Sequence, residues 1–175
     1  MSINIKKVVV GPLMTNCYIV EKNETCLIID PGDEEEKIIN NITFPPIAIL
    51  VTHSHNDHIG ALESLKALYN IPVYQYNNLN EGNINIGDFN IDVIYTKGHK
   101  DDSITIYFKE DEIMFTGDFL FKNSIGRTDL ETGNDIEMKK SIDKILKYND
   151  IIKIYPGHGP STTLGLEKKY NYYLK

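Results

Sequence analysis

The stretch IAILVTHSHNDHIGALESLKALY, residues 47–69, decides the fold of this chain. Its first part, residues 47–52, is a continuous apolar run of strand length, which is typical of a strand covered on both faces. Further along, apolar residues recur at helical spacing, at Ile59, Leu62, Leu65 and Leu68. The polar segment HSHNDH therefore lies in a loop between a buried strand and a helix.

The flanking sequence alternates strand and helix patterns. Strands are predicted at residues 3–11, 16–22, 25–30, 72–76, 84–96, 103–118 and 151–156, the fifth and sixth folded back as hairpins. Helices are predicted at residues 35–42, 136–148 and 164–175, the first two opened by capping boxes, Asp33 with Glu36 and Asn134 with Glu137. No repeat or linker interrupts the pattern, so residues 1–175 are expected to form one domain. It would be of the α/β class (α+β by some schemes), a four-layer αββα sandwich of two sheets with helices outside.

Composition excludes several classes of protein. The 18 basic and 25 acidic residues give a net charge of −7, which disfavours nucleic acid, although a local metal cluster could still attract a small anion. Cys17 and Cys26 lie in no CxxC pair, so we expect buried, reduced thiols. The apolar run near the N-terminus is too short for a signal peptide or membrane span, and we expect a cytoplasmic protein.

The segment HSHNDH offers three imidazoles and one carboxylate within a few residues. His53 and His55 are two positions apart, so in an extended segment both side chains project to the same side and can share one ion. Asp57 and His58 follow at the helix entrance. Nitrogen and hard oxygen donors together suit zinc, and also iron or manganese. Alternatively, Asp57 caps the helix and the histidines lie on a solvated loop.

Two further histidines and an aspartate strengthen the metal interpretation. His99 in TKGHKDDS and His158 in YPGHGP each end a predicted strand beside a glycine-bearing turn, so all five histidines lie at strand ends. Asp118 ends the apolar strand EIMFTGD, whereas a surface acid falls more naturally within the hairpin turn, as Asp111 does. Taken alone, Asp118 fits a ligand or a surface acid equally well.

These motifs together carry a family resemblance. HSHNDH, the GH of His99, the GD of Asp118 and the PGHG of His158, in that order, closely resemble the metallo-β-lactamase superfamily over almost the whole chain. Residues 117–130 and 155–171 look like the glyoxalase II (hydroxyacylglutathione hydrolase) branch, especially its short single-domain members. The resemblance implies two facing sheets flanked by helices, with metal ions in a groove at one edge.

The resemblance also assigns a ligand set and a reaction. Two divalent ions, zinc first with iron or manganese as alternatives, would be held by His53, His55 and His99, by Asp57, His58 and His158, and by Asp118 as a bridge. The expected enzyme is a binuclear hydrolase that cleaves a thioester such as a hydroxyacylglutathione through a metal-bridging hydroxide, with Asp57 as a catalytic residue that orients it. Many true β-lactamases have a cysteine in place of Asp118, so this residue argues against antibiotic hydrolysis.

Substrate recognition is where the sequence departs from its resemblance. Arg127, the only arginine, matches a basic contact for an acidic substrate tail, but an internal salt bridge fits equally well. The segment reads HKDDS where the branch commonly has HTPGS, and Asp101 and Asp102 add negative charge near the groove. The chain ends at Lys175 without the helical region that helps full-length glyoxalase II to hold glutathione, so glutathione specificity is not implied.

Several other functions compete with the thioester hydrolase. A lactone or simple ester could replace the thioester as the small-molecule substrate. A persulfide dioxygenase with a single iron has a similar fold and a similar HxHxDH motif. A nuclease of the superfamily would need a basic surface, which this composition does not provide. A non-catalytic binding module would normally have lost some ligands, whereas every ligand position here is filled.

Overall fold

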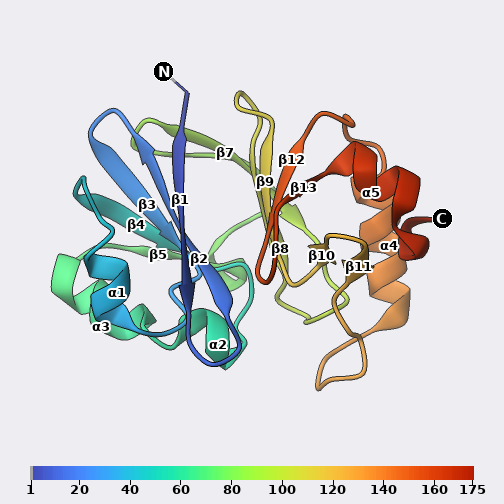
Figure 1. The fold of residues 1–175 in the computed structure, drawn as a ribbon, viewed down its shortest axis with the longest axis horizontal. Helices are drawn as coiled ribbons and strands as arrows, with labels where there is room; N and C mark the ends of the chain where they lie inside the picture. The colour runs from blue at the N-terminus through green and yellow to red at the C-terminus, as the bar shows by residue number, and fades with distance from the viewer. Residues whose placement is uncertain (1) are drawn as a thin grey trace.

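The computed structural model describes residues 2–175, whose strands form two large facing sheets (Figure 1). The first sheet has the order β1 (Asn4–Val10), β2 (Thr15–Lys22), β3 (Thr25–Ile29), β4 (Pro46–Leu50) and β5 (Val73–Tyr74). The second has the order β13 (Thr162–Thr163), β12 (Lys153–Pro156), β9 (Ile113–Gly117), β8 (Ile104–Phe108), β7 (Phe89–Tyr95) and β6 (Gly82–Ile86). A separate small hairpin consists of β10 (Leu120–Phe121) and β11 (Ser124–Ile125).

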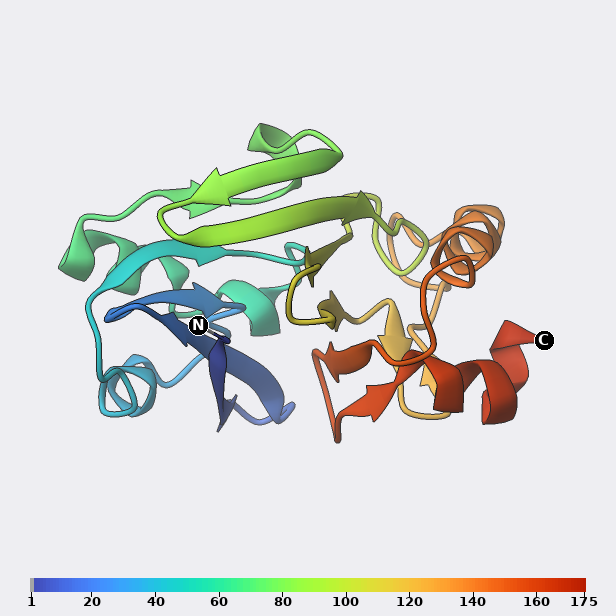
Figure 2. The ribbon, with the colours of Figure 1, turned by 90° about the horizontal axis from the view of Figure 1, so that it is seen from above.

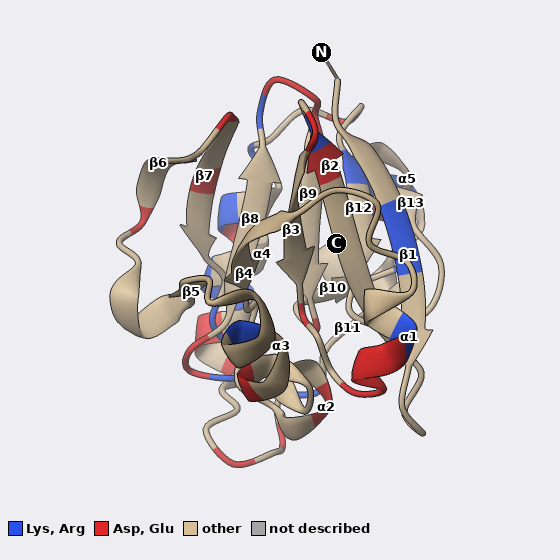
Figure 3. Cartoon of the chain, turned by 90° about the vertical axis from the view of Figure 1, so that its left-hand side faces the viewer, with Lys and Arg blue, Asp and Glu red and all other residues tan. Residues whose placement is uncertain are grey.

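Helices cover the outer face of each sheet. Near the first sheet lie α1 (Glu35–Ile39), α2 (Asn56–Ile59) and α3 (Leu62–Tyr69); near the second lie α4 (Asp135–Ile145) and α5 (Leu164–Tyr170), with short 3₁₀ turns at Tyr76–Asn78 and Tyr172–Leu174. Seen from above, the N-terminal strands, blue and cyan, lie on one side and the red C-terminal strands on the other (Figure 2). Acidic residues, in red, mark the start of α1 (Figure 3). None of the helices among residues 2–175 is long and apolar enough to cross a membrane.

Three apolar clusters correspond to the three contacts between layers. Between the sheets, Leu27 and Leu50 of the first pack with Phe89 and Phe108 of the second. Under α1 and α3, Ile38 and Leu65 pack on the outer face of the first sheet, and under α4 and α5, residues such as Met138 and Leu164 pack on the second. The predicted αββα sandwich is therefore confirmed, and Cys17 and Cys26 are buried and free, as expected.

The direction of the strands brings several loops to one edge. β4 runs parallel to β3, and β12 runs parallel to β9, because helices connect them. β4 is buried along most of its length, as its apolar sequence predicts. The loops that follow β4, β9 and β12 consequently leave the sheets at the same edge, and that edge carries the polar motifs.

Local structure differs from the sequence predictions in several places, among them the end of the C-terminal helix, which stops at Tyr170. The helix expected after HSHNDH is two helices, α2 and α3, which break at Gly60 and Ala61. The capping box of Asp33 with Glu36 was wrong: Glu34 precedes α1 in a left-handed conformation, and no side chain caps the helix. The β10–β11 hairpin was not predicted, because each of its strands has only two residues. At α4 the Asn134 cap is confirmed, since its side chain accepts hydrogen bonds from Ile136 and Glu137 amides.

Candidate metal centre

Four of the predicted ligands come from the connection between β4 and α3. His53 and His55 lie on the extended segment after β4, and Asp57 and His58 lie in α2. The first turn of this helix is closed by a hydrogen bond from the His58 amide to the His55 carbonyl of 2.9 Å. The short helix therefore turns its carboxylate and imidazole back toward the two histidines that precede it.

The remaining ligands come from the second sheet. His99 lies in the loop between β7 and β8, Asp118 directly follows β9, and His158 follows β12. The structure brings all seven predicted residues together, in three overlapping groups whose ligand atoms lie within 4.8 Å of one another: His53, His55 and His99; His53, His58 and Asp118; and Asp57, His58 and His158. Each half of the chain thus contributes to the cluster.

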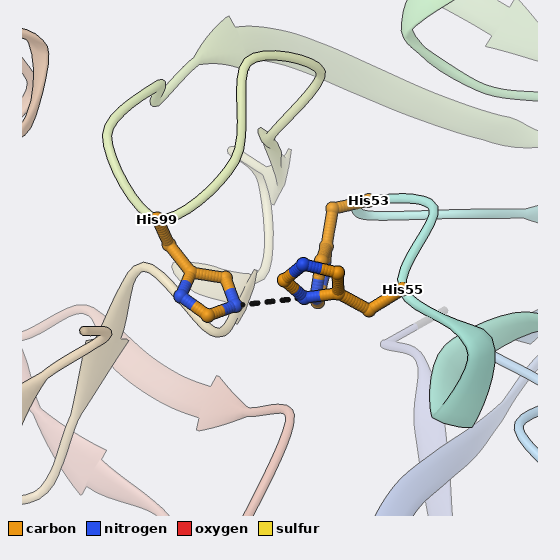
Figure 4. A group of neighbouring side chains, drawn as sticks. All are labelled: His53, His55 and His99. Carbon is orange, nitrogen blue, oxygen red and sulfur yellow. Dashed lines mark hydrogen bonds between the residues drawn. The ribbon is translucent and has the colours of Figure 1, made fainter. Parts of the chain in front are cut away.

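Three imidazoles converge in the first group (Figure 4). The Nδ1 atom of His55 lies 3.0 Å from Nε2 of His53 and 3.0 Å from Nε2 of His99. Two nitrogen ligands of one tetrahedral zinc ion, with bonds of about 2.0–2.1 Å, lie about 3.3 Å apart. The spacing of the three nitrogens is therefore close to that of ligands around a single ion.

Asp57, His58 and His158, called the second group from here on, have similar spacing. Asp118 connects this group to the first group, His53, His55 and His99. His158 Nε2 lies 3.2 Å from Asp57 Oδ2, and His58 Nε2 lies 3.5 Å from the same oxygen. Asp118 Oδ1 lies 3.3 Å from His58 Nε2, while its Oδ2 lies 3.3 Å from His158 Nε2 and 3.6 Å from His99 Nε2. One carboxylate therefore reaches histidines of both groups, as a bridging ligand would.

Hydrogen bonds on the outer side of the rings fix their tautomers. The Nδ1 atoms of His58, His99 and His158 face the Asp30 carboxylate, the Arg127 carbonyl and the Leu13 carbonyl at 2.9, 2.8 and 3.1 Å. Because carbonyl and carboxylate oxygens only accept, Nδ1 must carry the proton in each case. In the neutral form of each ring, the lone pair on Nε2 then faces the inside of the cluster, which is how histidine ligands are usually held.

Two buried atoms at the centre have no hydrogen-bond partner among residues 2–175. They are His58 Nε2 and Asp118 Oδ1, both at the junction of the two groups. Buried polar atoms are rarely left unpaired, because losing their hydration without compensation is costly. A divalent cation would satisfy both atoms, so the nitrogen and oxygen donor set fits metal ions.

The charges in the cluster are strongly perturbed. Burial lowers the pKa of His53 and His55, so both are neutral near pH 7. Burial also opposes the charge on His58, but the Asp30 and Asp118 carboxylates outweigh it and raise the pKa of His58 to about 10. Asp118 itself is held well below its usual pKa: burial acts the other way, but His158 and His58 dominate. The first group is thus ready for a cation, whereas the second holds protons that a cation must displace.

Comparison with known proteins gives the family. The model of the metallo-beta-lactamase superfamily matches residues 10–81 and 78–158, which include every residue of the cluster. The chain belongs to the metallo-β-lactamase superfamily. Within it, the chain is 34% identical to the probable metallo-hydrolase YqgX of Bacillus subtilis over 203 residues, covering 97% of this chain and 96% of the relative. It is 31% identical to the hydroxyacylglutathione hydrolase GloC of Haemophilus influenzae over 207 residues, covering 98% of each.

Solved structures of the metallo-β-lactamase superfamily agree with this fold. The BLEG-1 B3 metallo-beta-lactamase superposes with a TM-score of 0.93 at 32% identity, covering 98% of this chain and 99% of that one. TTHA1623 in a di-iron-bound form gives 0.90 at 33% identity, covering 96% and 99%. ETHE1 from Myxococcus xanthus gives 0.86 at 25% identity, covering 97% and 83%. Proteins of this fold bind divalent metals, and this chain has the histidines and aspartates to do so.

Sequence reasoning missed Asp30, which organises one side of this metallo-β-lactamase centre. Its carboxylate is buried and accepts hydrogen bonds from the Thr52 amide at 2.7 Å, from the Thr52 hydroxyl at 2.6 Å and from His58 Nδ1 at 2.9 Å. Its φ of 51° is unusual for a residue other than glycine, and such strain often accompanies a functional site. The available signal was that Asp30, like Asp118, ends an apolar strand.

Arg127 has a different role in the metallo-β-lactamase centre from the one that its charge indicates. Its guanidinium donates two hydrogen bonds to Asp129, at 2.6 and 2.7 Å, and 62% of the side chain is exposed. The internal salt bridge that the sequence allowed is therefore present. Its backbone carbonyl, not its side chain, touches the cluster, because it accepts the hydrogen bond from His99. The substrate contact stays a prediction.

Proposed function

We propose that the protein is a binuclear metal-dependent hydrolase that cleaves an acyl thioester. The observation that carries this proposal is the position of Asp118, whose oxygens lie within 3.6 Å of histidines from both ligand groups. Two divalent ions held by His53, His55 and His99, by Asp57, His58 and His158, and by Asp118 between them, would supply Lewis acidity and an activated water.

The chain's own residues would orient that water. Asp57 Oδ2 accepts a hydrogen bond from the Thr15 hydroxyl at 2.8 Å and lies 3.2 Å from His158 Nε2, so the carboxylate is fixed in place. Burial opposes its charge, but His158 and His58 hold the pKa of Asp57 well below its usual value, so the carboxylate would orient the attacking water and not take its proton. A thiolate can leave without being protonated first, because thiols are more acidic than alcohols. The reaction therefore needs no proton donor for the leaving group.

A thioester is favoured over other acyl compounds by two considerations. Hydroxyacylglutathione hydrolase GloC, a relative along nearly its entire length, carries a thioester substrate in its name. In this chain the apolar side chains of Leu13 and Met14 are 64% and 66% exposed on the turn whose carbonyl orients His158. Exposed apolar residues beside polar ligands suit a substrate with an apolar acyl or thiol part.

The first experiment measures metal per chain and activity on the same sample. Protein purified without chelator would be analysed for zinc, iron and manganese, then assayed with S-lactoylglutathione, a simple ester and a β-lactam. Two ions per chain with thioester hydrolysis would support the proposal, while β-lactam turnover without thioester turnover would refute it. Asp57→Asn should lower kcat at least about a hundredfold even when enough zinc is added to fill both sites.

Oxygen chemistry is the second candidate, and one observation favours it. His53, His58 and Asp118 form a group of two histidines and one carboxylate within 4.8 Å, the donor set that non-haem iron oxygenases use. ETHE1 from Myxococcus xanthus also shares this fold. An oxygen electrode with glutathione persulfide separates the two functions: one iron per chain with oxygen uptake, and no thioester turnover, would replace the hydrolase by a dioxygenase.

A further inference from the structure

A lysine follows the third histidine of the centre directly. Lys100 lies in the loop between β7 and β8, and only 19% of its side chain is exposed, although lysines on loops are usually well solvated. Two aspartates follow it, with Asp101 61% exposed and Asp102 only 19% exposed. The loop therefore keeps one cation and one carboxylate close to the protein surface rather than in solvent.

The contacts of Asp102 locate the lysine relative to the centre. Asp102 Oδ1 accepts a hydrogen bond of 3.4 Å from the amide of Ser54, the residue between His53 and His55. Lys100 Nζ lies 3.9 Å from the same oxygen. The ammonium group thus lies beside the segment that carries the first ligand group.

The ammonium of Lys100 has donors to spare. Its nearest carboxylate oxygens, of Asp101 and Asp102, are 3.6 and 3.9 Å away, beyond normal hydrogen-bond length. Lys97, in the same loop, is different: it donates to the Tyr76 hydroxyl at 2.6 Å and lies over the Tyr76 ring. Lys100 can therefore turn toward a ligand without giving up a protein hydrogen bond, whereas Lys97 is held in place by the hydroxyl and the ring of Tyr76.

Lys100 is also on the accessible side of the centre. His53 and His58 are buried, whereas His55 and His158 are partly exposed, so a substrate reaches the ions past these two rings. The ammonium lies 3.9 Å from the Asp102 oxygen that accepts from the amide of Ser54, the residue before His55, so it borders this approach. The chain has a net charge of −7, so Lys100 would attract an anion through direct contact and not through the overall field of the protein.

We propose that Lys100 binds a carboxylate of the substrate, so that the enzyme prefers acyl thioesters with a carboxylate on the acyl or the thiol part. The inference rests on the proposed thioesterase function and names its substrate class. The neighbouring carboxylates do not cancel the charge, because Asp101 is mostly in water and Asp102 is directed to the Ser54 amide. Lys100 acts on binding, and the reaction itself uses the metal centre.

Matched substrates test this preference. One pair is the acetyl thioester of 3-mercaptopropionate and that of its amide, which differ in the charge of the thiol part. The other is the half-thioester of adipate with 2-mercaptoethanol and its terminal amide, which differ in the acyl part. We expect wild-type protein to prefer the acid of one pair at least fivefold in kcat/KM, and that pair identifies the part that carries the carboxylate.

Variants identify the residue responsible. Lys100→Gln should raise KM for the preferred acid at least fivefold and leave its kcat unchanged. The KM and kcat of both amide substrates should not change. Lys100→Arg should restore the preference for the acid. Lys97→Gln removes the same charge from the same loop and should leave the preference intact. A purely structural role of Lys100 would lower turnover of acid and amide equally, and that result would overturn the proposal.

A binding measurement separates this proposal from the proposed function. Calorimetry on zinc-loaded protein would compare 3-mercaptopropionate with 3-mercaptopropionamide, and adipate monoamide with adipamide. If no thioester is hydrolysed but wild-type protein binds an acid more tightly than its amide, and Lys100→Gln does not, the thioesterase function fails and the carboxylate site stands. Equal binding of acid and amide by wild-type protein, with no preference in turnover, refutes the carboxylate site.

Discussion

Asp30 controls the orientation of His58, although it is not itself among the ligands. Its carboxylate receives His58 Nδ1 and both polar groups of Thr52. We expect Asp30→Asn to weaken binding of one ion per chain by about 10- to 100-fold, the usual effect of losing an outer partner of a metal-binding histidine. A competition titration with a chromophoric chelator measures this loss.

The matched control for Asp30→Asn is Asp88→Asn, which makes the same change at an exposed carboxylate that accepts a hydrogen bond from the Asn23 side chain. It should bind both ions as wild-type protein does. If Asp30→Asn also keeps both affinities, then Asp30 does not orient a ligand, and its hydrogen bonds serve only the fold.

Proton competition should distinguish the two ligand groups. Before a cation binds, His58 and His158 keep their protons, since Asp30 and Asp118 raise the pKa of the first to about 10, and Asp118 and Asp57 raise that of the second to about 9, in both cases against burial. A cation must displace these protons, so binding to this group strengthens as pH rises. The neutral His53 and His55 impose no such cost above pH 7.

The expected result is an affinity for one ion that rises about tenfold or more per pH unit between pH 7 and 8.5, while that for the other changes little. Competition with a chelator at several pH values measures the zinc affinity of each of the two ligand groups. The number of protons released when zinc binds in weakly buffered solution is an independent check. Two affinities with the same pH slope would contradict the assigned protonation states.

At the centre itself, the sequence predicted which side chains gather there. It did not predict the groups that form hydrogen bonds to those side chains. The seven candidate ligands could be named from the resemblance of their motifs to the metallo-β-lactamase superfamily, supported by the places of the histidines at strand ends. The carbonyls of Leu13 and Arg127, which orient His158 and His99, carry no signature, because every residue has a carbonyl. The Thr15 hydroxyl on Asp57 depends on a contact across 42 residues, which no local pattern indicates.

Among the elements, the end of β12 has a tight steric requirement that involves two side chains of the metal centre. A Cβ atom on Gly157 would lie 2.2 Å from Asp118 Oδ1 and 2.6 Å from His58 Cε1. We expect Gly157→Ala to push these ligands apart and to reduce the metal content to one ion or fewer per chain, while the circular dichroism spectrum keeps its wild-type shape. Elemental analysis measures the loss.

Gly159→Ala is the control for this steric effect. Gly159 has a φ of 74° but no atom within 4 Å of an added Cβ, so alanine there causes backbone strain of about 1 kcal/mol without a clash. It should lower the melting temperature slightly and keep both ions. Equal metal loss in the two variants would mean that a change in the loop backbone causes the loss at Gly157, and not the clash of the added Cβ.

Long elements were predicted well, and short or interrupted ones were not. The buried strand β4 and the helix α4 follow from their apolar runs and the Asn134 cap. The break between α2 and α3 does not follow, because the apolar spacing continues through Gly60. Gly60 packs so closely on Gly32 that an added Cβ would lie 2.2 Å from the Gly32 carbonyl oxygen, a tertiary contact that periodicity cannot indicate.

Over the whole molecule, metal ions would connect two halves of the chain. His53 to His58 follow the first sheet, while His99, Asp118 and His158 come from the second. A bound ion stabilises the fold by about 2.7 kcal/mol when the free metal concentration is 100 times its Kd. Chelation should therefore lower the melting temperature by roughly 5–10 °C for a chain of this size.

Scanning calorimetry with and without chelator measures this shift, and Asp118→Ala is the control. Without the bridging carboxylate, the variant should bind metal weakly, and its melting temperature should hardly respond to chelator. A shift as large in Asp118→Ala as in wild-type protein would mean that the stabilising metal lies elsewhere.

One contact between the ends of the chain also bears on how the protein is made. The Asn16 amide donates to the Gly157 carbonyl at 2.7 Å, and its side chain donates to the Pro156 carbonyl at 2.9 Å, across 140 residues. At about 5–20 residues per second, a ribosome needs roughly 7–30 s to add that length. The first hairpin therefore lacks these hydrogen bonds until Pro156 and Gly157 have been added, and the second ligand group can form only after His158 has been added.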